Sequence, residues 1–205
     1  MRAHGNEGRL GRRFLLAAGL TIAVVVPSAA FGGTASFYPK CDSPRCVPPI
    51  GWIHVEREKG KKNKRVEALN FYQFKVNCPT SGPQIVQTDL DKPITGEIVR
   101  SEIAIDAKVQ HGKWHFNELV PDAVGRSSNE RIDASINFRG KFRKHNKDKA
   151  DGTLEVTLEG GATYLYPDVS GPEPIVTEWP IVDFEPEGCH GVQDFHVNLL
   201  RPKDR

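Results

Sequence analysis

The chain has 205 residues, with 28 Lys and Arg against 26 Asp and Glu, for a formal net charge of +2 at pH 7. Residues 31–205 alone carry 24 basic and 25 acidic side chains. Nucleic-acid-binding domains are usually strongly basic, so we expect no nucleic-acid partner. These 175 residues are enough for one domain with a sizeable core and too few to argue for two.

The N-terminal segment has the pattern of an export signal. Its apolar run covers residues 14–26 and is followed by small residues at Ser28 and Ala30. Arginines precede this run (Arg9, Arg12, Arg13). We interpret residues 1–30 as a signal peptide cleaved after Ala30, or next best after Gly32. The run is shorter than the roughly 20 residues that cross a bilayer, so we expect a secreted or cell-envelope protein with no membrane span after cleavage. The paired arginines also fit twin-arginine export, although an ordinary secretory signal is preferred.

From Trp52 onward, apolar and polar residues alternate in short runs, which is typical of half-buried strands. In residues 69–79, four side chains fall on one face at a period of two (Tyr72, Phe74, Val76, Cys78). Similar runs predict further strands (53–58, 66–78, 85–88, 98–109, 113–117, 132–142, 152–159 and 195–199). We expect a turn at residues 110–113, a polar loop at 121–129 and a charged loop at 143–151. We expect Trp114 to lie in the core.

This pattern predicts an all-β fold, specifically an antiparallel β-sandwich of immunoglobulin-like architecture with roughly seven to nine strands over residues 52–200. Residues 31–51 are expected to form an irregular arm, and residues 201–205 a tail. Five prolines interrupt residues 160–188 (Pro167, Pro172, Pro174, Pro180, Pro186). They exclude a central strand and a long helix there. We expect a long ordered excursion, or an edge strand broken by loops.

Four cysteines in an exported chain are typical of two disulfides. Of the three possible pairings we favour Cys41–Cys46 and Cys78–Cys189, because the first closes a small loop and the second joins two predicted strands. A four-cysteine zinc site usually shows two close pairs, and this chain has only one. The spacing of Cys41 and Cys46 is not that of a Cys-x-x-Cys redox motif.

Several short motifs follow one another in a recognisable order. Phe74-Lys-Val-Asn-Cys78 is followed by Gly112-Lys-Trp-His-Phe116, by Gly140-Lys-Phe142 with Gly152-Thr-Leu154, and by a strand from Cys189 to Phe195. In this order the chain resembles a group of small bacterial secreted β-sandwich proteins with no assigned activity, over about residues 52–200. The resemblance implies a fold and a compartment and supplies no catalytic residue. Residues 160–188 and the Cys41–Cys46 arm lie outside the shared pattern.

Motifs for catalysis are missing from the sequence. It has no Gly-x-Ser-x-Gly, no His-Glu-x-x-His and no phosphate-binding glycine loop. His111 and His115 would lie about 13 Å apart along a strand, too far to share a metal ion. We therefore expect no cofactor and treat catalysis as the secondary interpretation. The alternatives are a secreted hydrolase with a carboxylate or histidine site, and a metal-binding envelope protein.

Two basic loops, residues 59–65 and 139–149, would form a cationic patch for anionic polymers or lipid head groups if both lay at one end of the domain. Charged hairpin tips also keep β-proteins soluble, and this is the simpler interpretation.

The aromatic residues of the proline-rich excursion are the candidate binding surface (Tyr164, Tyr166, Trp179). Alternation does not dictate their burial, so they either form an exposed platform or pin the excursion to the sheet. The leading hypothesis is an exported, non-catalytic module that binds a protein or polysaccharide of the extracellular space or cell envelope.

Overall fold

The computed structural model describes residues 33–39, 48–58, 62–88, 90–91, 98–100, 102–127, 129–168 and 175–199. These residues form strands and connections without any helix, so the predicted all-β class is confirmed. The strands are β1 (Thr34–Pro39), β2 (Trp52–Glu58), β3 (Lys62–Asn70), β4 (Phe74–Cys78), β5 (Gly82–Val86), β6 (Leu90–Asp91), β7 (Ile98–Arg100), β8 (Ile103–Lys108), β9 (Lys113–Val124), β10 (Glu130–Arg143), β11 (Asn146–Asp168), β12 (Ile175–Pro180) and β13 (His190–Leu199). The proposed signal peptide, Cys41, Cys46 and the tail lie outside the described residues.

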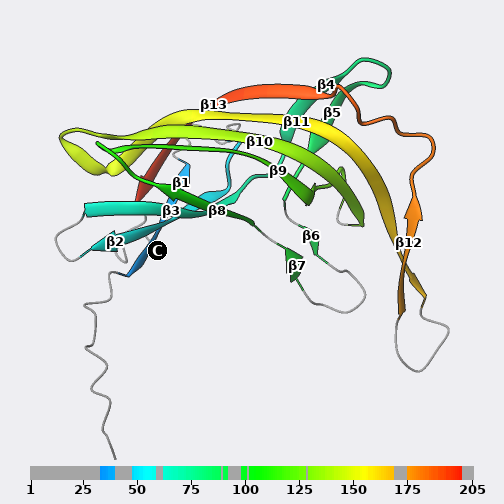
Figure 1. Ribbon diagram of the computed structural model, residues 1–205, viewed down its shortest axis with the longest axis horizontal. Coiled ribbons are helices and arrows are strands. Elements are labelled where there is room, and N and C mark those ends of the chain that lie inside the picture. Colours follow the sequence, from blue (N-terminus) through cyan, green and yellow to red (C-terminus); the bar gives the residue numbers. More distant parts are fainter. Residues whose placement is uncertain are drawn as a thin grey trace, which may run out of the picture.

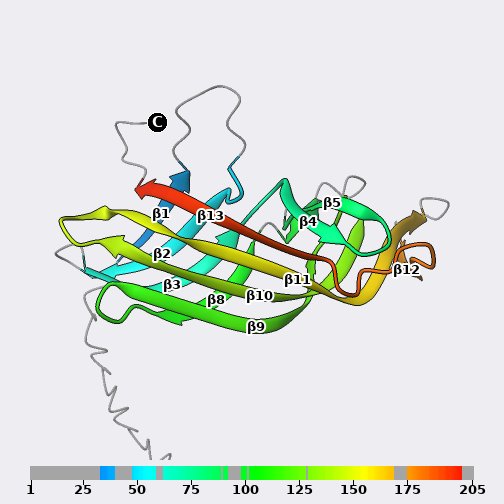
Figure 2. The ribbon, with the colours of Figure 1, turned by 90° about the horizontal axis from the view of Figure 1, so that it is seen from above.

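Eleven of these strands belong to one antiparallel sheet, whose main path runs β8-β3-β2-β1-β13-β11-β10-β9. Three further strands branch off this path. β12 pairs with β11, and the β4–β5 hairpin pairs with β13 through β4. The sheet curls so that β9, β10, β11 and β13 form one layer over β2, β3 and β8 (Figure 1). Viewed from above, the long strands run side by side along the molecule (Figure 2). Hydrogen bonds through β1 join the two layers into a single sheet.

The turn at residues 110–113 forms where the sequence predicts it. His111 and Gly112 both have positive φ, 50° and 76°, as a two-residue type I′ turn requires. Beyond the Gln110–Lys113 bridge the two strands separate, because β8 pairs with β3 and β9 pairs with β10. The turn therefore brings the two ends of the curled sheet together.

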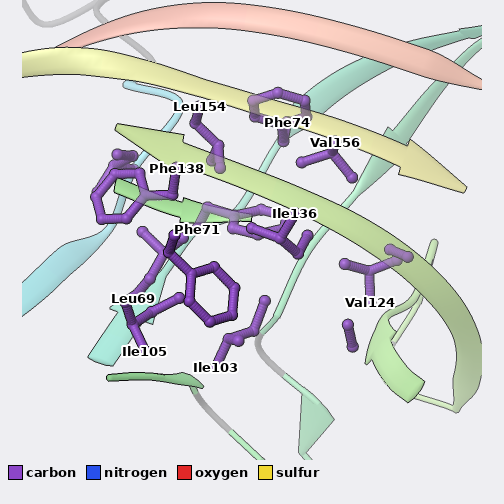
Figure 3. Close-up of a cluster of buried hydrophobic side chains, with 14 of the residues drawn as sticks. Leu69, Phe71, Phe74, Ile103, Ile105, Val124, Ile136, Phe138, Leu154 and Val156 are labelled. Carbon is purple, nitrogen blue, oxygen red and sulfur yellow. The ribbon is translucent and has the colours of Figure 1, made fainter. Parts of the chain in front are cut away.

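A single apolar core fills the space between the layers. Side chains of β10 and β11, such as Ile136 and Leu154, point toward Leu69 and Ile105 of the opposite layer (Figure 3). Trp114 is 3% exposed and its ring lies 4.9 Å from that of Phe142, which confirms the prediction that it is a core residue.

Opposite this ring, a glycine is required for packing. A Cβ on Gly140 would lie 2.2 Å from Trp114 Cζ2. Only a residue without a side chain therefore leaves room for the indole in this layer.

The predicted strand 66–78 is interrupted. β3 ends at Asn70 and β4 begins at Phe74, with Gln73 at a φ of 55° between them. The side chain of Phe71 is fully buried, whereas that of Tyr72 is 36% exposed, so the prediction that Tyr72 faces the core is wrong. The bend shifts the alternation by one residue, after which Phe74, Val76 and Cys78 are buried as expected.

Two segments expected to be irregular are strands, which partly explains why the described chain has more strands than predicted. Residues 34–39 of the expected arm form β1, which pairs with β2 and β13 and buries Phe37. Its flanking Gly and Pro residues obscure the alternation in the sequence. The expected polar loop 121–129 instead continues β9 to Val124, with Asp122 at a φ of 51°. Ala123 and Val124 are fully buried there.

The predicted disulfide between Cys78 and Cys189 is present. It joins the end of β4 to the residue before β13, across a sequence separation of 111. Both cysteines are buried. β4 and β13 also pair at Asn77 and His190, and Gln193 Nε2 donates to the Lys75 carbonyl at 3.4 Å. The disulfide thus adds a covalent link to a short contact between the β4–β5 hairpin and the closing strand.

We expect replacement of both cysteines, Cys78→Ala with Cys189→Ala, to lower the free energy of unfolding by about 2–5 kcal/mol, because a loop of this length becomes unconstrained in the unfolded chain. Urea unfolding followed by tryptophan fluorescence measures the change. A loss below about 1 kcal/mol would contradict a stabilising role. The oxidised wild-type protein, compared with and without reductant, is the control.

Candidate binding surfaces

The candidate aromatic residues meet on one face of a two-stranded ribbon. β11 pairs with β12 from Thr163–Pro180 to Asp168–Ile175, and β10 pairs with β11 as far as Glu130–Tyr164, so only the outer part of the ribbon is two-stranded. In this register Tyr164 lies directly opposite Trp179, and Tyr166 lies two residues further along the same face. Tyr164, Tyr166 and Trp179 are 37%, 57% and 59% exposed. We call these three side chains the aromatic face.

The proline-rich segment thus includes an edge strand, one of the two predicted possibilities. β12 pairs only with β11 among the described strands and ends at Pro180. An edge strand tolerates proline, because backbone amides on its open side donate no hydrogen bond to a neighbouring strand. The ribbon extends beyond the layered body of the molecule (Figure 1).

Two glycines let β11 leave the sheet. Gly160 and Gly161 have φ values of 130° and 68°, a region that other residues rarely adopt. A Cβ on Gly161 would lie 2.8 Å from a carboxylate oxygen of Asp133. The pairing of β10 with β11 shifts register at Asp133, opposite these glycines. The bend therefore sets the direction of the ribbon.

The base of the ribbon is held to the body by hydrogen bonds. The amide of Leu165 donates to the Asn129 carbonyl at 2.6 Å, and Asn129 Nδ2 donates to the Tyr164 hydroxyl at 3.2 Å. On the return segment, the amide of Ile181 donates to the Ala162 carbonyl at 2.9 Å. These bonds fix Tyr164 in orientation, while Tyr166 lies further out along the ribbon.

Just beyond the ribbon, the return segment packs into the body. Phe184 is 4% exposed, and the Arg126 guanidinium carbon lies 3.8 Å from the centre of its ring. Arg126 also donates two hydrogen bonds to the Glu130 carboxylate, at 2.8 and 2.9 Å. The described part of the excursion therefore consists of an exposed ribbon and a return segment that is anchored by the buried Phe184.

The outer face of β9, β10, β11 and β13 carries the histidines and carboxylates of the hydrolase hypothesis. His190 contacts Glu155 at 2.9 Å, Asn137 Nδ2 donates to Glu155 at 2.9 Å, and His115 contacts Asn137 at 3.1 Å. This row depends on cross-strand register, and no spacing in the sequence signals it. Hydrogen bonding to His190 is the main cause that lowers the pKa of Glu155.

Asp151 is the most strongly perturbed carboxylate of this face. Arg143 donates two hydrogen bonds to it at 2.8 Å, and His196 Nδ1 lies 2.6 Å away. These contacts, that of Arg143 first, lower the pKa of Asp151 from 3.8 to about 2. A general base works best with a pKa near the working pH, so Asp151 is a poor base. It is an ion-pair partner within a shallow depression of about 460 Å³.

The hydrolase and metal hypotheses gain no assembled site here. The carboxylates Glu155 and Asp151 are both held ionised, and neither is placed beside an activated nucleophile. Among the described side chains, no group of three or more His, Cys, Asp or Glu residues is arranged to hold a metal ion. Within the same residues, no helix has the length and apolar character to cross a membrane.

We expect Asp151 to make stability pH-dependent. Its pKa is lowered on folding, so its contribution is present above the unfolded-state pKa of about 3.9 and is lost as the pH falls toward 2. Urea unfolding at pH 6 should show Asp151→Asn to be less stable than wild type by about 1–2 kcal/mol, a figure reduced for the exposure of Arg143. This difference should shrink steadily below pH 4 and become small near pH 2, where about half of Asp151 is protonated in the folded protein.

Arg143→Gln is the matching control. It removes the main cause of the shift, so the carboxyl resonance of Asp151, followed by NMR, should titrate at higher pH than in wild type. An unchanged midpoint would show that Arg143 does not hold this carboxylate.

Comparison of the chain with protein-family models, with curated proteins and with solved structures finds no match.

Proposed function

We propose that this protein is an exported, non-catalytic binding module that engages a protein of the extracellular space or cell envelope through its aromatic face. One observation carries the proposal: Tyr164, Tyr166 and Trp179 lie exposed together on a ribbon that extends from the body of the domain. The export-signal pattern at the N-terminus supports the compartment.

The ribbon has the properties of a binding element. An isolated two-stranded ribbon is marginally stable in water, and exposed aromatic rings forgo the stabilisation that burial provides. Tyr and Trp are enriched at protein interfaces and supply many of their strongest contacts. Binding a partner would bury the rings of Trp179 and Tyr166 and stabilise the ribbon at the same time.

A protein partner is favoured over a polysaccharide because of the open strand edge. Among the described strands, β12 has a neighbour on one side only, and an extended segment of another protein can add to such an edge through main-chain hydrogen bonds. The aromatic face would then contact side chains of the same partner. A polysaccharide uses the rings but has no means of pairing with the edge.

The immunoglobulin-like sandwich also remains a proposal. Two layers that face each other across one core support it. An immunoglobulin-like sandwich has two separate sheets, and this fold differs in that hydrogen bonds through β1 join the two layers. The resemblance to small secreted bacterial β-sandwich proteins supports both the architecture and the compartment.

We expect the double substitution Tyr166→Ala with Trp179→Ala to weaken binding to isolated cell envelopes of the source organism at least tenfold, because interface aromatics contribute about 2 kcal/mol or more each. Sedimentation of the labelled protein with the envelopes measures retention. Protease treatment of the envelopes should abolish it, whereas periodate oxidation of their glycans should leave it intact. The reverse pattern would assign the aromatic face to polysaccharide.

The control is the pair Leu119→Ala with Val192→Ala. These side chains are 60% and 52% exposed and lie on β9 and β13, away from the ribbon. Thermal unfolding of both double variants should match wild type, since all four side chains are exposed. Equal retention of the two double variants would exclude the aromatic face as the binding site.

A further inference from the structure

Three turns far apart in the sequence meet at the end of the molecule opposite the ribbon. They are the ends of β2 and β3, the turn between β8 and β9, and the turn between β10 and β11 (Figures 1 and 2). Together they enclose a pocket of about 480 Å³. Its lining comes from all three turns (Lys62, Asn63, Val109, His111, Gly112, Phe142, Arg143, Lys144, Lys147). The described residues 62–65 of the first predicted basic loop begin β3, and the second predicted loop is mostly strand and forms the β10–β11 hairpin. These described parts lie at one end of the molecule.

Hydrogen bonds between the turns hold the pocket in shape. Asn63 Nδ2 donates to the Lys147 carbonyl at 3.1 Å, and the amide of Val109 donates to the Lys64 carbonyl at 2.7 Å. The third link joins Phe142 to Gly112, amide to carbonyl, at 2.8 Å. These three hydrogen bonds connect each pair of turns directly. The backbone around the pocket is therefore organised before a ligand binds.

A buried ion pair behind the pocket reinforces this link. Arg57 Nη2 lies 2.9 Å from Asp148 Oδ1, and the two side chains are only 10% and 14% exposed. Arg57 also lies over the ring of Phe37 at 5.9 Å, and Phe37 packs 5.5 Å from Phe142. The floor of the pocket is therefore part of the core.

The charge of the lining has one sign. Lys62, Arg143, Lys144 and Lys147 contribute cations, and no carboxylate belongs to the described lining. Two neighbouring acids are engaged with cations outside the lining, Glu58 with Lys64 and Asp148 with Arg57. Asp151 pairs with Arg143 of the lining and with His196, so the positive charge of the pocket comes from its three lysines. If these cations served only to keep the protein soluble, we would expect them to be dispersed over convex hairpin tips. Instead, they line a pocket.

The floor of this pocket is apolar. Phe142 and Val109 form part of it, beneath the rim of lysines. The volume lies within the range of about 300–1,000 Å³ that is usual for small-molecule sites. Apolar floor and cationic rim together match a ligand with a multiply charged head and an organic body, and a phosphate monoester meets both requirements.

We propose that this pocket binds an organic phosphate, with the phosphate group among Lys62, Lys144 and Lys147 and the organic portion against Phe142 and Val109. Arg143 lines the pocket, but its charge is offset by Asp151, to which it is bonded. The site is independent of the aromatic face, so the two proposals stand or fall separately. The phosphate can come from a small ester in solution or from a lipid head group.

Calorimetric titration of the whole protein at low ionic strength tests the proposal. Phenyl phosphate should bind, inorganic phosphate should bind more weakly because it leaves the floor unfilled, and phenol should not bind. Raising the salt concentration should weaken binding of phenyl phosphate, since the lysines of the rim are exposed. Flotation with vesicles of phosphatidic acid, a lipid phosphate monoester, compared with phosphatidylcholine, tests the lipid source.

The substitutions Lys144→Glu and Lys147→Glu, made together, should weaken binding of phenyl phosphate at least tenfold. The control pair, Lys75→Glu with Lys108→Glu, makes the same change in net charge at exposed positions outside the pocket and should alter the affinity less than twofold. Should the charge-reversed protein unfold, Lys144→Gln with Lys147→Gln gives a milder loss that can be read against the same control.

Each outcome is decisive. Binding of phenyl phosphate, or of phosphatidic acid vesicles alone, that the pocket pair weakens selectively supports an organic-phosphate site and identifies its source. Equal effects of the two lysine pairs would mean that net charge alone is responsible, and would overturn the proposal. So would failure of both phenyl phosphate and anionic vesicles to bind the wild-type protein.

Discussion

The register of β11 determines where each candidate binding residue lies. This strand of 23 residues pairs with β10 on one side and with β13 and then β12 on the other. Because side chains alternate along a strand, a slip of one residue would exchange Leu154 and Val156 for polar neighbours in the core. Beyond Leu158 the bend at Gly160 and Gly161 shifts this alternation by one residue, so that Leu165 is buried. Tyr164 and Tyr166 are exposed because of that shift.

The two candidate surfaces differ because their supports differ. The cationic pocket is backed by the core through Phe142, and three turns brace it. The aromatic face lies on β11 and β12, and β10 supports it only at its base, opposite Tyr164. A rigid concavity suits a ligand of defined shape, whereas a ribbon can adjust to a larger partner. The separation of these surfaces along the molecule would let both be occupied at once.

Local alternation and turn residues were sufficient to predict the all-β class, the turn at residues 110–113 and most of the core, because each depends on residues adjacent in the chain. The Cys78–Cys189 pairing followed from only four cysteines and their positions. Prediction failed where the backbone conformation shifted the alternation of buried and exposed side chains. This happens at Gln73 and Asp122, which both have positive φ. It also failed for β1, whose role in the sheet depends on partners distant in sequence.

Of the candidate sites, the sequence identified the residue types and left their juxtaposition undetermined. Aromatic residues within a proline-rich segment pointed to Trp179, but only the pairing of β11 with β12 places it opposite Tyr164. Likewise the basic loops were visible in the composition, whereas the pocket requires the β8–β9 turn between them. The ion-pair cluster around Asp151 had no signal, because its members are brought together by cross-strand register alone.

The position of β1 has a consequence for the order of events in folding. β1 lies between β2 and β13 in the interior of the sheet, so Phe37 near the beginning of the described chain is paired with Leu199 near its end. Contacts between such distant residues form slowly, because a long loop must close before they stabilise anything. β2, β3 and β8 can pair with one another early, as can β9, β10 and β11, but the two halves cannot be joined through β1 and β13 until the last strand has been synthesised. The native sheet is therefore a property of the finished polypeptide, and shorter nascent chains expose the edges that β13 will cover.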